Sequence, residues 1–190
     1  MPDKKTDPRT AKTRRAIFEA LAELLTEKEL RKVTVHDISE RAQINRVTFY
    51  NHFLDVYDLN DKLETGILTE MGMLMLRMQE LPSGEIMSAL IDYADSNRPV
   101  FRLIFSPNVT VQLRTKFERL FEGVFRQTQA EKQNSDIRDT LLEYRCCYRS
   151  HGCLAVLERW VRGDFSEPKA FVLEALSGLD RNTEDYLLAN

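Results

Sequence analysis

The stretch from Val33 to Phe53 reads Val-Thr-Val-His-Asp-Ile-Ser-Glu-Arg-Ala-Gln-Ile-Asn-Arg-Val-Thr-Phe-Tyr-Asn-His-Phe. Thr34 directly precedes a helical pattern, and a hydroxyl side chain at that position predicts a helix N-cap. Asp37 follows three residues later, which is close to the spacing of a capping box. The stretch therefore begins with a short, well-capped helix. Its buried side is expected to contain Val35, Ile38 and Ala42.

A second short helix follows after a turn. Residues 43–44 form the expected turn, and Asn45 caps a helix that runs to about His52. Phe49 and Phe53 are expected to face inward and to attach this helix to its neighbours. Two short helices joined by three or four residues are typical of a helix-turn-helix.

Upstream of this stretch, the chain has the pattern of an amphipathic helix from about Pro8 to Lys28. Its N-terminal turns are basic and can lie along a phosphate backbone, while its apolar side packs inward. The apolar side is expected to contain Ile17, Leu21, Leu24 and Leu25.

Downstream, the helical pattern continues with few breaks. Leu81-Pro82-Ser83-Gly84 is the clearest break, Gly163 is expected to close a helix and Pro168 to open the last one. Strand-type alternation is almost absent, so the sequence predicts an all-α fold of about nine helices. We expect a helix-turn-helix domain over 1–54 and a second helical domain over 55–190. The expected helices of the second domain cover about 55–78, 85–96, 98–105, 108–129, 136–162 and the residues after 168.

Charge is distributed unevenly along the 190 residues. The net charge is −3, which argues against a protein that coats nucleic acid indiscriminately. The first 50 residues contain 11 Lys and Arg against 8 Asp and Glu, a net +3, so the other 140 residues carry −6. A basic N-terminal region on an acidic body fits a DNA-binding head, because only the face that meets DNA needs cations.

The polar side chains at the start of the second short helix are suited to reading DNA. Arg46 can donate two hydrogen bonds to guanine. Asn45 and Thr48 can bond bases or phosphates, and Val47 can touch a thymine methyl group. For Asn45 and Arg46, the alternative is a capped turn exposed to water. For the residues expected to make contacts to the DNA backbone, the alternative is a packed or solvated surface position. Those backbone contacts are expected from Thr34, Tyr50, Asn51, His52, Lys12, Arg14 and Arg15.

Residues 33–53 resemble the DNA-binding signature of the TetR/AcrR family of transcriptional regulators. With the basic first helix, the resemblance covers about residues 10 to 62. It implies a regulator that binds operator DNA as a homodimer, dimerises through its last two helices and holds an effector cavity in its helical body. The matching elements are the Thr34 cap, Ile38, Ala42, the run Thr48-Phe49-Tyr50, and His52-Phe53 followed by an acidic residue and Leu59.

Three residues depart from the pattern of that family. Gln43 replaces the usual glycine of the turn, so a residue with a side chain must either tolerate an awkward backbone geometry there or shift the turn slightly. Val56 stands where a lysine is common at the start of the fourth helix, which removes one expected phosphate contact, although the helix N-terminus can still serve. Val47 replaces a small glycine and adds bulk on the side that faces the groove.

The body contains two groups of apolar residues that fit these implied roles. For both groups, ordinary core packing within one chain is the alternative. The candidates for the dimer interface are Leu154, Leu157, Trp160, Val161, Phe171 and Leu176. The candidates for lining an adaptable apolar effector pocket are Met75, Met78, Phe101, Phe105, Phe117 and Phe121.

Three cysteines lie close together in the C-terminal half. Cys147 and His151 are four residues apart and share a helix face, which raises metal binding or redox sensing, with Cys146 and Cys153 nearby. Two ligands do not close a metal site, so we expect no metal and no cofactor. The odd number of cysteines and the lack of an apolar leader indicate a reduced, cytoplasmic setting.

The leading hypothesis is a ligand-responsive repressor in which an effector changes the spacing of two DNA-binding heads. The alternative is a coactivator or adaptor whose body binds a partner protein. An enzyme is not expected, because we find no Gly-rich phosphate loop, metal cluster or nucleophile–base pair with convincing spacing. No membrane partner is expected either, because the longest apolar stretch, residues 71–76, is far shorter than the ~20 residues that a span requires.

Overall fold

The computed structural model describes residues 8–81, 83–133 and 140–188, and within these ranges it contains nine α-helices, a short 3-10 helix and no strand. The all-α prediction is confirmed, whereas the 3-10 helix was not anticipated. The first four residues of the helix predicted over 136–162, residues 136–139, lie outside the described residues. The elements are α1 (Pro8–Glu27), η1 (Leu30–Lys32), α2 (Val35–Arg41), α3 (Arg46–Tyr50), α4 (Val56–Gln79), α5 (Ser83–Ser96), α6 (Arg98–Ile104), α7 (Val111–Gln133), α8 (Thr140–Arg162) and α9 (Lys169–Leu188).

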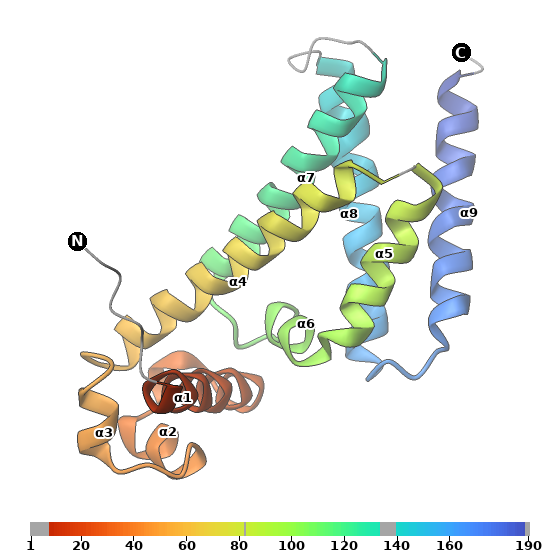
Figure 1. The fold of residues 1–190 in the computed structure, drawn as a ribbon. Helices are drawn as coiled ribbons and strands as arrows, with labels where there is room; N and C mark the ends of the chain where they lie inside the picture. Colours follow the sequence, from red (N-terminus) through yellow and green to blue (C-terminus); the bar gives the residue numbers. More distant parts are fainter. Residues whose placement is uncertain (1–7, 82, 134–139, 189–190) are drawn as a thin grey trace.

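Helices α1, α2 and α3 form a small head at one end of the molecule (Figure 1). The apolar side of α1 packs against α2, and side chains from all three helices meet in a core that excludes water. Removing such side chains from water stabilises a short-helix head that has little intrinsic helical stability of its own. The fully buried members include Ile17, Leu21, Ile38 and Phe49.

The body is built from α4 to α9. The long helix α4 leads out of the head and runs beside α7, α8 packs against α7, and α9 lies beside α5 (Figure 1). One apolar cluster extends from Ile17 in the head to Trp160 and Leu176 in the body. Head and body therefore share a continuous core. None of the described helices is long and apolar enough to span a membrane.

Two hydrogen bonds join the head to the body at the end of α6. The Ser106 hydroxyl donates to the backbone carbonyl of Leu25 over 2.9 Å, and this contact is buried. The Asn108 side-chain amide donates to the carbonyl of Thr26 over 3.4 Å. Both acceptors lie in the last turn of α1, where helix carbonyls have no partner within the helix. The body thus holds the C-terminal end of α1.

The chain between α8 and α9 contains the least expected backbone geometry. Gly163 does follow the last residue of α8, but the left-handed residues are the next two, Asp164 and Phe165, with φ of 55° and 57°. A Cβ at Gly163 would lie 3.4 Å from the carbonyl oxygen of Arg159, a close contact that glycine avoids. Gly163 therefore ends the helix as predicted, but not by adopting the left-handed conformation.

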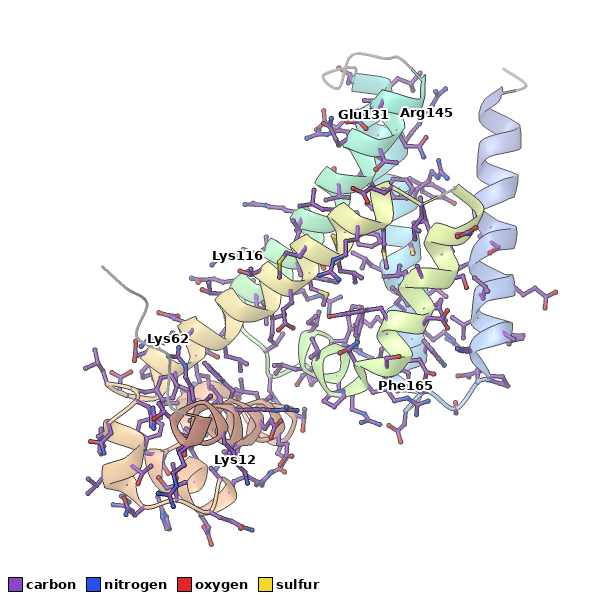
Figure 2. The ribbon with its side chains drawn as sticks, viewed as in Figure 1. Lys12, Lys62, Lys116, Glu131, Arg145 and Phe165 are labelled. Carbon is purple, nitrogen blue, oxygen red and sulfur yellow. The ribbon has the colours of Figure 1, made fainter. Side chains whose placement is uncertain are left out.

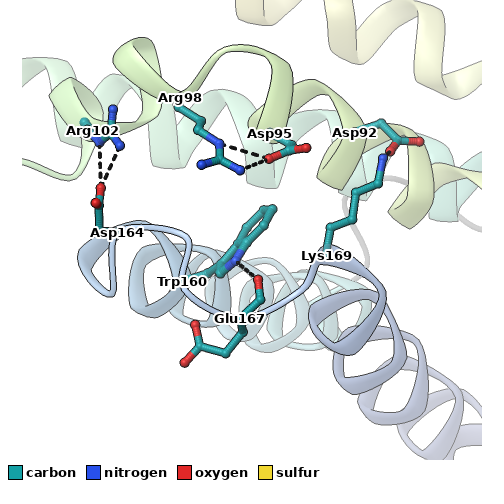
Figure 3. Close-up of polar contacts among 8 residues, drawn as sticks. All are labelled: Asp92, Asp95, Arg98, Arg102, Trp160, Asp164, Glu167 and Lys169. Atoms are coloured by element: carbon teal, nitrogen blue, oxygen red, sulfur yellow. Dashed lines mark hydrogen bonds and ion pairs between the residues drawn. The ribbon is translucent and has the colours of Figure 1, made fainter.

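Side-chain contacts hold this left-handed pair in place, and Figure 3 shows the one between Asp164 and Arg102. Asp164 pairs with Arg102 of α6 over 2.6 Å. The buried Phe165 ring packs edge-on against Trp160, with 4.9 Å between centroids, and the Arg98 guanidinium lies 4.7 Å from its centre. These contacts offset the strain of two consecutive left-handed residues. They also attach the α8–α9 connection to α6.

Candidate DNA-binding interface

The cap of α2 fixes the first half of the helix-turn-helix. The amide of Asp37 donates to the Thr34 hydroxyl over 3.2 Å, and the amide of Thr34 donates to the Asp37 carboxylate over 2.8 Å. The predicted capping box is therefore confirmed. The ammonium group of Lys28, 2.9 Å away, and the bonds from Thr34 lower the pKa of Asp37 to about 2. Thr34 itself is exposed, but its hydroxyl is committed to this cap.

The turn between α2 and α3 is built around a left-handed residue. Gln43 has a φ of 55°, which costs roughly 1–2 kcal/mol for a residue with a Cβ. The amide of Ile44 donates to the Ser39 carbonyl over 2.9 Å, so the turn closes directly onto α2. The awkward geometry predicted at Gln43 is confirmed. The turn therefore has the left-handed backbone conformation that is usual for glycine, although Gln43 carries a side chain.

Asn45 caps α3, as predicted. Its side-chain oxygen accepts hydrogen bonds from the backbone amide of Thr48 over 2.8 Å and from the Thr48 hydroxyl over 3.0 Å. This arrangement occupies the Thr48 hydroxyl proton and the Asn45 oxygen. The Asn45 amide nitrogen and the Thr48 methyl group remain for contacts outside the head.

The two sides of α3 differ sharply. Phe49 is fully buried and packs against Phe53, which confirms the predicted inward direction of both rings. The opposite side carries Arg46, which is exposed, and Val47 and Tyr50, whose side chains are 69% and 58% exposed. The buried Phe49 ring fixes the rotation of this five-residue helix about its axis, so the opposite side faces outward.

Two of the remaining side chains near α3, Tyr50 and His52, lie against phenylalanine rings. Asn51 follows α3 and is exposed, whereas His52 is half-buried and lies 6.2 Å from the Phe53 ring centre. Tyr50 packs edge-on against Phe49, with 5.5 Å between centroids. The hydroxyphenyl group of Tyr50 is thus held in place although its surface is open. Their roles in DNA contact stay predictions.

The three basic residues of α1 that the sequence singled out have different environments. Lys12 is exposed on the head (Figure 2). Arg15 is exposed and pairs with Glu19 over 2.7 Å, a contact that contributes little in water. The Arg14 guanidinium lies 5.6 Å and 5.5 Å from the ring centres of Phe18 and Phe53. Arg14 is therefore positioned by cation–π contacts at the edge of the helix-turn-helix.

The start of α4 completes the surface beside α3. Val56 is buried in the core, so this position offers no side chain for the phosphate contact that the sequence indicated as missing. Asp55 caps α4 by accepting from the amide of Asp58 over 2.8 Å. The sequence pattern did not single out Leu54 and Tyr57, which are 82% and 58% exposed. Leu54 lies between α3 and α4, and Tyr57 lies in the first turn of α4, so their position next to the second short helix was the signal that could have found them.

The predicted dimer-interface residues lie mostly inside one chain. Leu154, Leu157, Trp160, Val161 and Leu176 are all buried, and only Phe171 is exposed. Those five side chains therefore pack in the core of one chain, which was the alternative to a dimer interface. They leave little apolar surface for contact with a second copy. A different group on α8 and α9 is exposed, and we name it the α8/α9 face. It consists of Leu141, Tyr144, Tyr148, Phe171 and Leu179.

The predicted pocket residues meet in the core of the body. Four rings form a connected series from α6 into α7, with centroid separations of 6.4 Å, 6.3 Å and 6.4 Å. All six candidates belong to the main apolar cluster and are buried. The members of the series, in order, are Phe101, Phe105, Phe117 and Phe121, and Met75 and Met78 come from α4.

Comparison with known families gives one match in the helix-turn-helix head and one in the helical body. A family model described as "Bacterial regulatory proteins, tetR family" matches residues 17–55, and one described as "Transcriptional regulator C-terminal region" matches residues 83–180. The chain belongs to the TetR family. As a TetR-family protein it is a DNA-binding transcriptional regulator and not an enzyme. No curated protein matches the sequence.

Several solved structures of regulators share the fold. A transcriptional regulator from Aquifex aeolicus VF5 is 18% identical, with a TM-score of 0.66 over 88% of this chain and 98% of that one. The fatty acid degradation regulator FadR from Bacillus halodurans is 12% identical, with a TM-score of 0.65 over 87% and 96%. FadR from Bacillus subtilis, solved with stearoyl-CoA, is 16% identical, with a TM-score of 0.58 over 85% and 96%. At these identities the likeness concerns the fold.

Proposed function

We propose that this TetR-family protein is a ligand-responsive repressor that binds palindromic operator DNA as a homodimer, with α3 of each copy in the major groove. The observation that carries the proposal is the exposed side of α3, with Arg46, Val47 and Tyr50 opposite the buried Phe49. In this position Arg46 donates two hydrogen bonds to a guanine, and Val47 contacts a thymine methyl group. The Asn45 amide nitrogen and Thr48 add contacts at the start of the helix.

Phosphate contacts surround this reading helix in the proposal. Lys12 and Arg15 are exposed on α1, and Arg14 is held against Phe18 and Phe53 at the boundary of α1 and the helix-turn-helix. Neutralising phosphates in this way supplies affinity without sequence preference. The other members of the contact surface are Thr34, Tyr50, Asn51 and His52.

A second copy is required because one short recognition helix buries too little surface for specific binding. We assign the dimer contact to the α8/α9 face, in which five large apolar side chains are left in water by the single chain. Exposed apolar patches of this kind mark interaction sites. In this account, residues 1–54 read DNA, and residues 55–190 dimerise and respond to the effector.

The effector is proposed to be apolar and to enter the core of the body between α4, α6 and α7. Side chains such as Met75, Met78 and Phe117 are all apolar there, and methionines adapt readily to a guest. Because Ser106 and Asn108 tie the body to the end of α1, a shift of α6 is transmitted to the head. The stearoyl-CoA bound by the Bacillus subtilis protein makes long acyl chains the first ligands to test. The setting proposed for this regulation is the cytoplasm.

An adaptor, whose body binds a partner protein, is the second candidate, and one experiment separates the two. The purified chain is mixed with labelled DNA from upstream of its own gene, with unlabelled specific or random DNA as competitor. A direct regulator forms a shifted complex that only the specific competitor removes. An adaptor forms no specific complex until its partner is added, and that result would overturn the proposal.

A further inference from the structure

Helices α7 and α8 bring three metal-binding side chain types together. Glu122 of α7 faces Cys147 and His151 of α8, and one ligand atom from each lies within 4.8 Å of the others. The two helices run side by side along this length (Figure 1). The sequence showed only the pair on α8. The fold supplies the third side chain from a position 25 residues earlier.

The spacing of these atoms suits a tetrahedral ion. The Cys147 Sγ and the His151 Nδ1 are 3.8 Å apart. Zinc–sulfur and zinc–nitrogen bonds of about 2.3 Å and 2.05 Å at a tetrahedral angle place the two atoms about 3.6 Å apart. His151 Nδ1 also lies 2.9 Å from the Cys147 carbonyl oxygen. That oxygen is the acceptor of the helical hydrogen bond as well, so it keeps a partner when the ring nitrogen turns to a metal.

Charge and accessibility are also favourable. A Cys147 thiolate and the Glu122 carboxylate together offset the two charges of a divalent ion. Within the described part of the chain, no hydrogen bond or ion pair engages the Glu122 carboxylate, while the nearby Arg126 is 3.9 Å from Glu143. Cys147 and His151 are exposed, so an ion and a water ligand can reach them.

We propose that Glu122, Cys147 and His151 form a binding site for a divalent cation of the zinc type, with a fourth position open to water. One sulfur, one imidazole nitrogen and one carboxylate oxygen favour zinc or cobalt over magnesium and calcium, which prefer oxygen ligands alone. The ion joins α7 to α8 in the body. This assignment is independent of how α3 reads DNA.

Cobalt is the probe that tests the site, because a thiolate ligand produces an intense near-ultraviolet charge-transfer absorption. The metal-free protein is titrated with Co²⁺, and Zn²⁺ is then added as a competitor. We expect a saturable absorption at one ion per chain that zinc abolishes. The absorption is lost in Cys147→Ser, and affinity falls at least about tenfold in Glu122→Gln and in His151→Ala.

Two variants serve as matched controls. Glu131→Gln removes an exposed carboxylate elsewhere on α7, and His36→Ala removes an exposed imidazole on α2. Both are expected to bind cobalt as the unmodified protein does, and circular dichroism verifies that every variant is folded. Absorption that persists in Cys147→Ser would come from the buried Cys146 or Cys153 and would overturn the site. An unchanged affinity in Glu122→Gln, or no absorption in the unmodified protein, would overturn it too.

Discussion

The Asn45 side-chain oxygen accepts two hydrogen bonds from Thr48, one from its backbone amide and one from its hydroxyl. The residue that caps α3 is thereby locked to the residue one turn later. In the proposed function, cap formation and DNA contact share the same two side chains. A useful experiment must therefore separate stability from recognition.

Asn45→Asp and Asn45→Ala separate these two roles. Aspartate keeps an oxygen that caps α3, so its free energy of unfolding should stay close to that of the unmodified protein. Alanine removes the cap and should cost about 1 kcal/mol. Aspartate also places a negative charge beside the DNA phosphates and should weaken operator binding more than alanine does. Urea unfolding and fluorescence anisotropy measure the two effects, and equal DNA affinities in both variants would argue against a contact at this position.

Gln43→Gly should stabilise the head. Gln43 holds a φ of 55°, which glycine adopts without steric strain. Glycine also increases the entropy of the unfolded chain, so we expect a net gain of up to about 1 kcal/mol. Gln43→Val is the opposing variant and should lower the free energy of unfolding, because a β-branched residue suits this conformation poorly. A loss of stability in Gln43→Gly would contradict the assigned geometry.

The α2 cap makes stability depend on pH in the acid range. Lys28 and Thr34 lower the pKa of Asp37 to about 2, below the usual value of 3.8 for an aspartate side chain. The contribution of this carboxylate is therefore complete above about pH 4 and disappears as the pH falls toward about 2. We expect Asp37→Asn to show a smaller drop in the free energy of unfolding over that interval than the unmodified protein. Parallel pH curves for the two proteins would contradict this.

Tyr148→Glu should separate a dimer into monomers. Tyr148 belongs to the exposed α8/α9 face, where a buried, unpaired charge would oppose association. Met73→Glu, at an exposed apolar position on α4, is the matched control and should leave the mass in solution unchanged. Sedimentation equilibrium measures both. A dimer that survives Tyr148→Glu but not Met73→Glu would place the interface on α4 instead.

Much of the fold follows from local signals in the sequence. The caps at Thr34 and Asn45 use contacts within four residues, and the inward direction of Phe49 follows from helical periodicity alone. These features depend on few distant neighbours. The strain at Gln43 was expected from the resemblance to the TetR family, in which a glycine is usual at this position of the turn.

Other features depend on contacts between distant segments, and the sequence could not reveal them. Apolar residues occur on two sides of α8, and periodicity does not tell that Leu157 faces the core while Tyr148 faces outward. Glu122 joins Cys147 only because α7 and α8 are neighbours. Phe165 takes a left-handed conformation because Trp160, Arg98 and Arg102 surround its ring. None of these pairings has a local pattern.

Arg46→Ala tests the central claim most directly. The matched control is Arg119→Ala, which removes an exposed arginine from α7 in the body. Operator affinity is measured by fluorescence anisotropy at fixed salt, on the operator and on variants with each guanine replaced. If Arg46 reads a guanine, Arg46→Ala weakens binding by about 1–3 kcal/mol, or about 5- to 150-fold, and loses the preference at one base pair, while Arg119→Ala binds normally. Unchanged affinity and specificity in Arg46→Ala would contradict the assignment of α3 as the element that reads DNA.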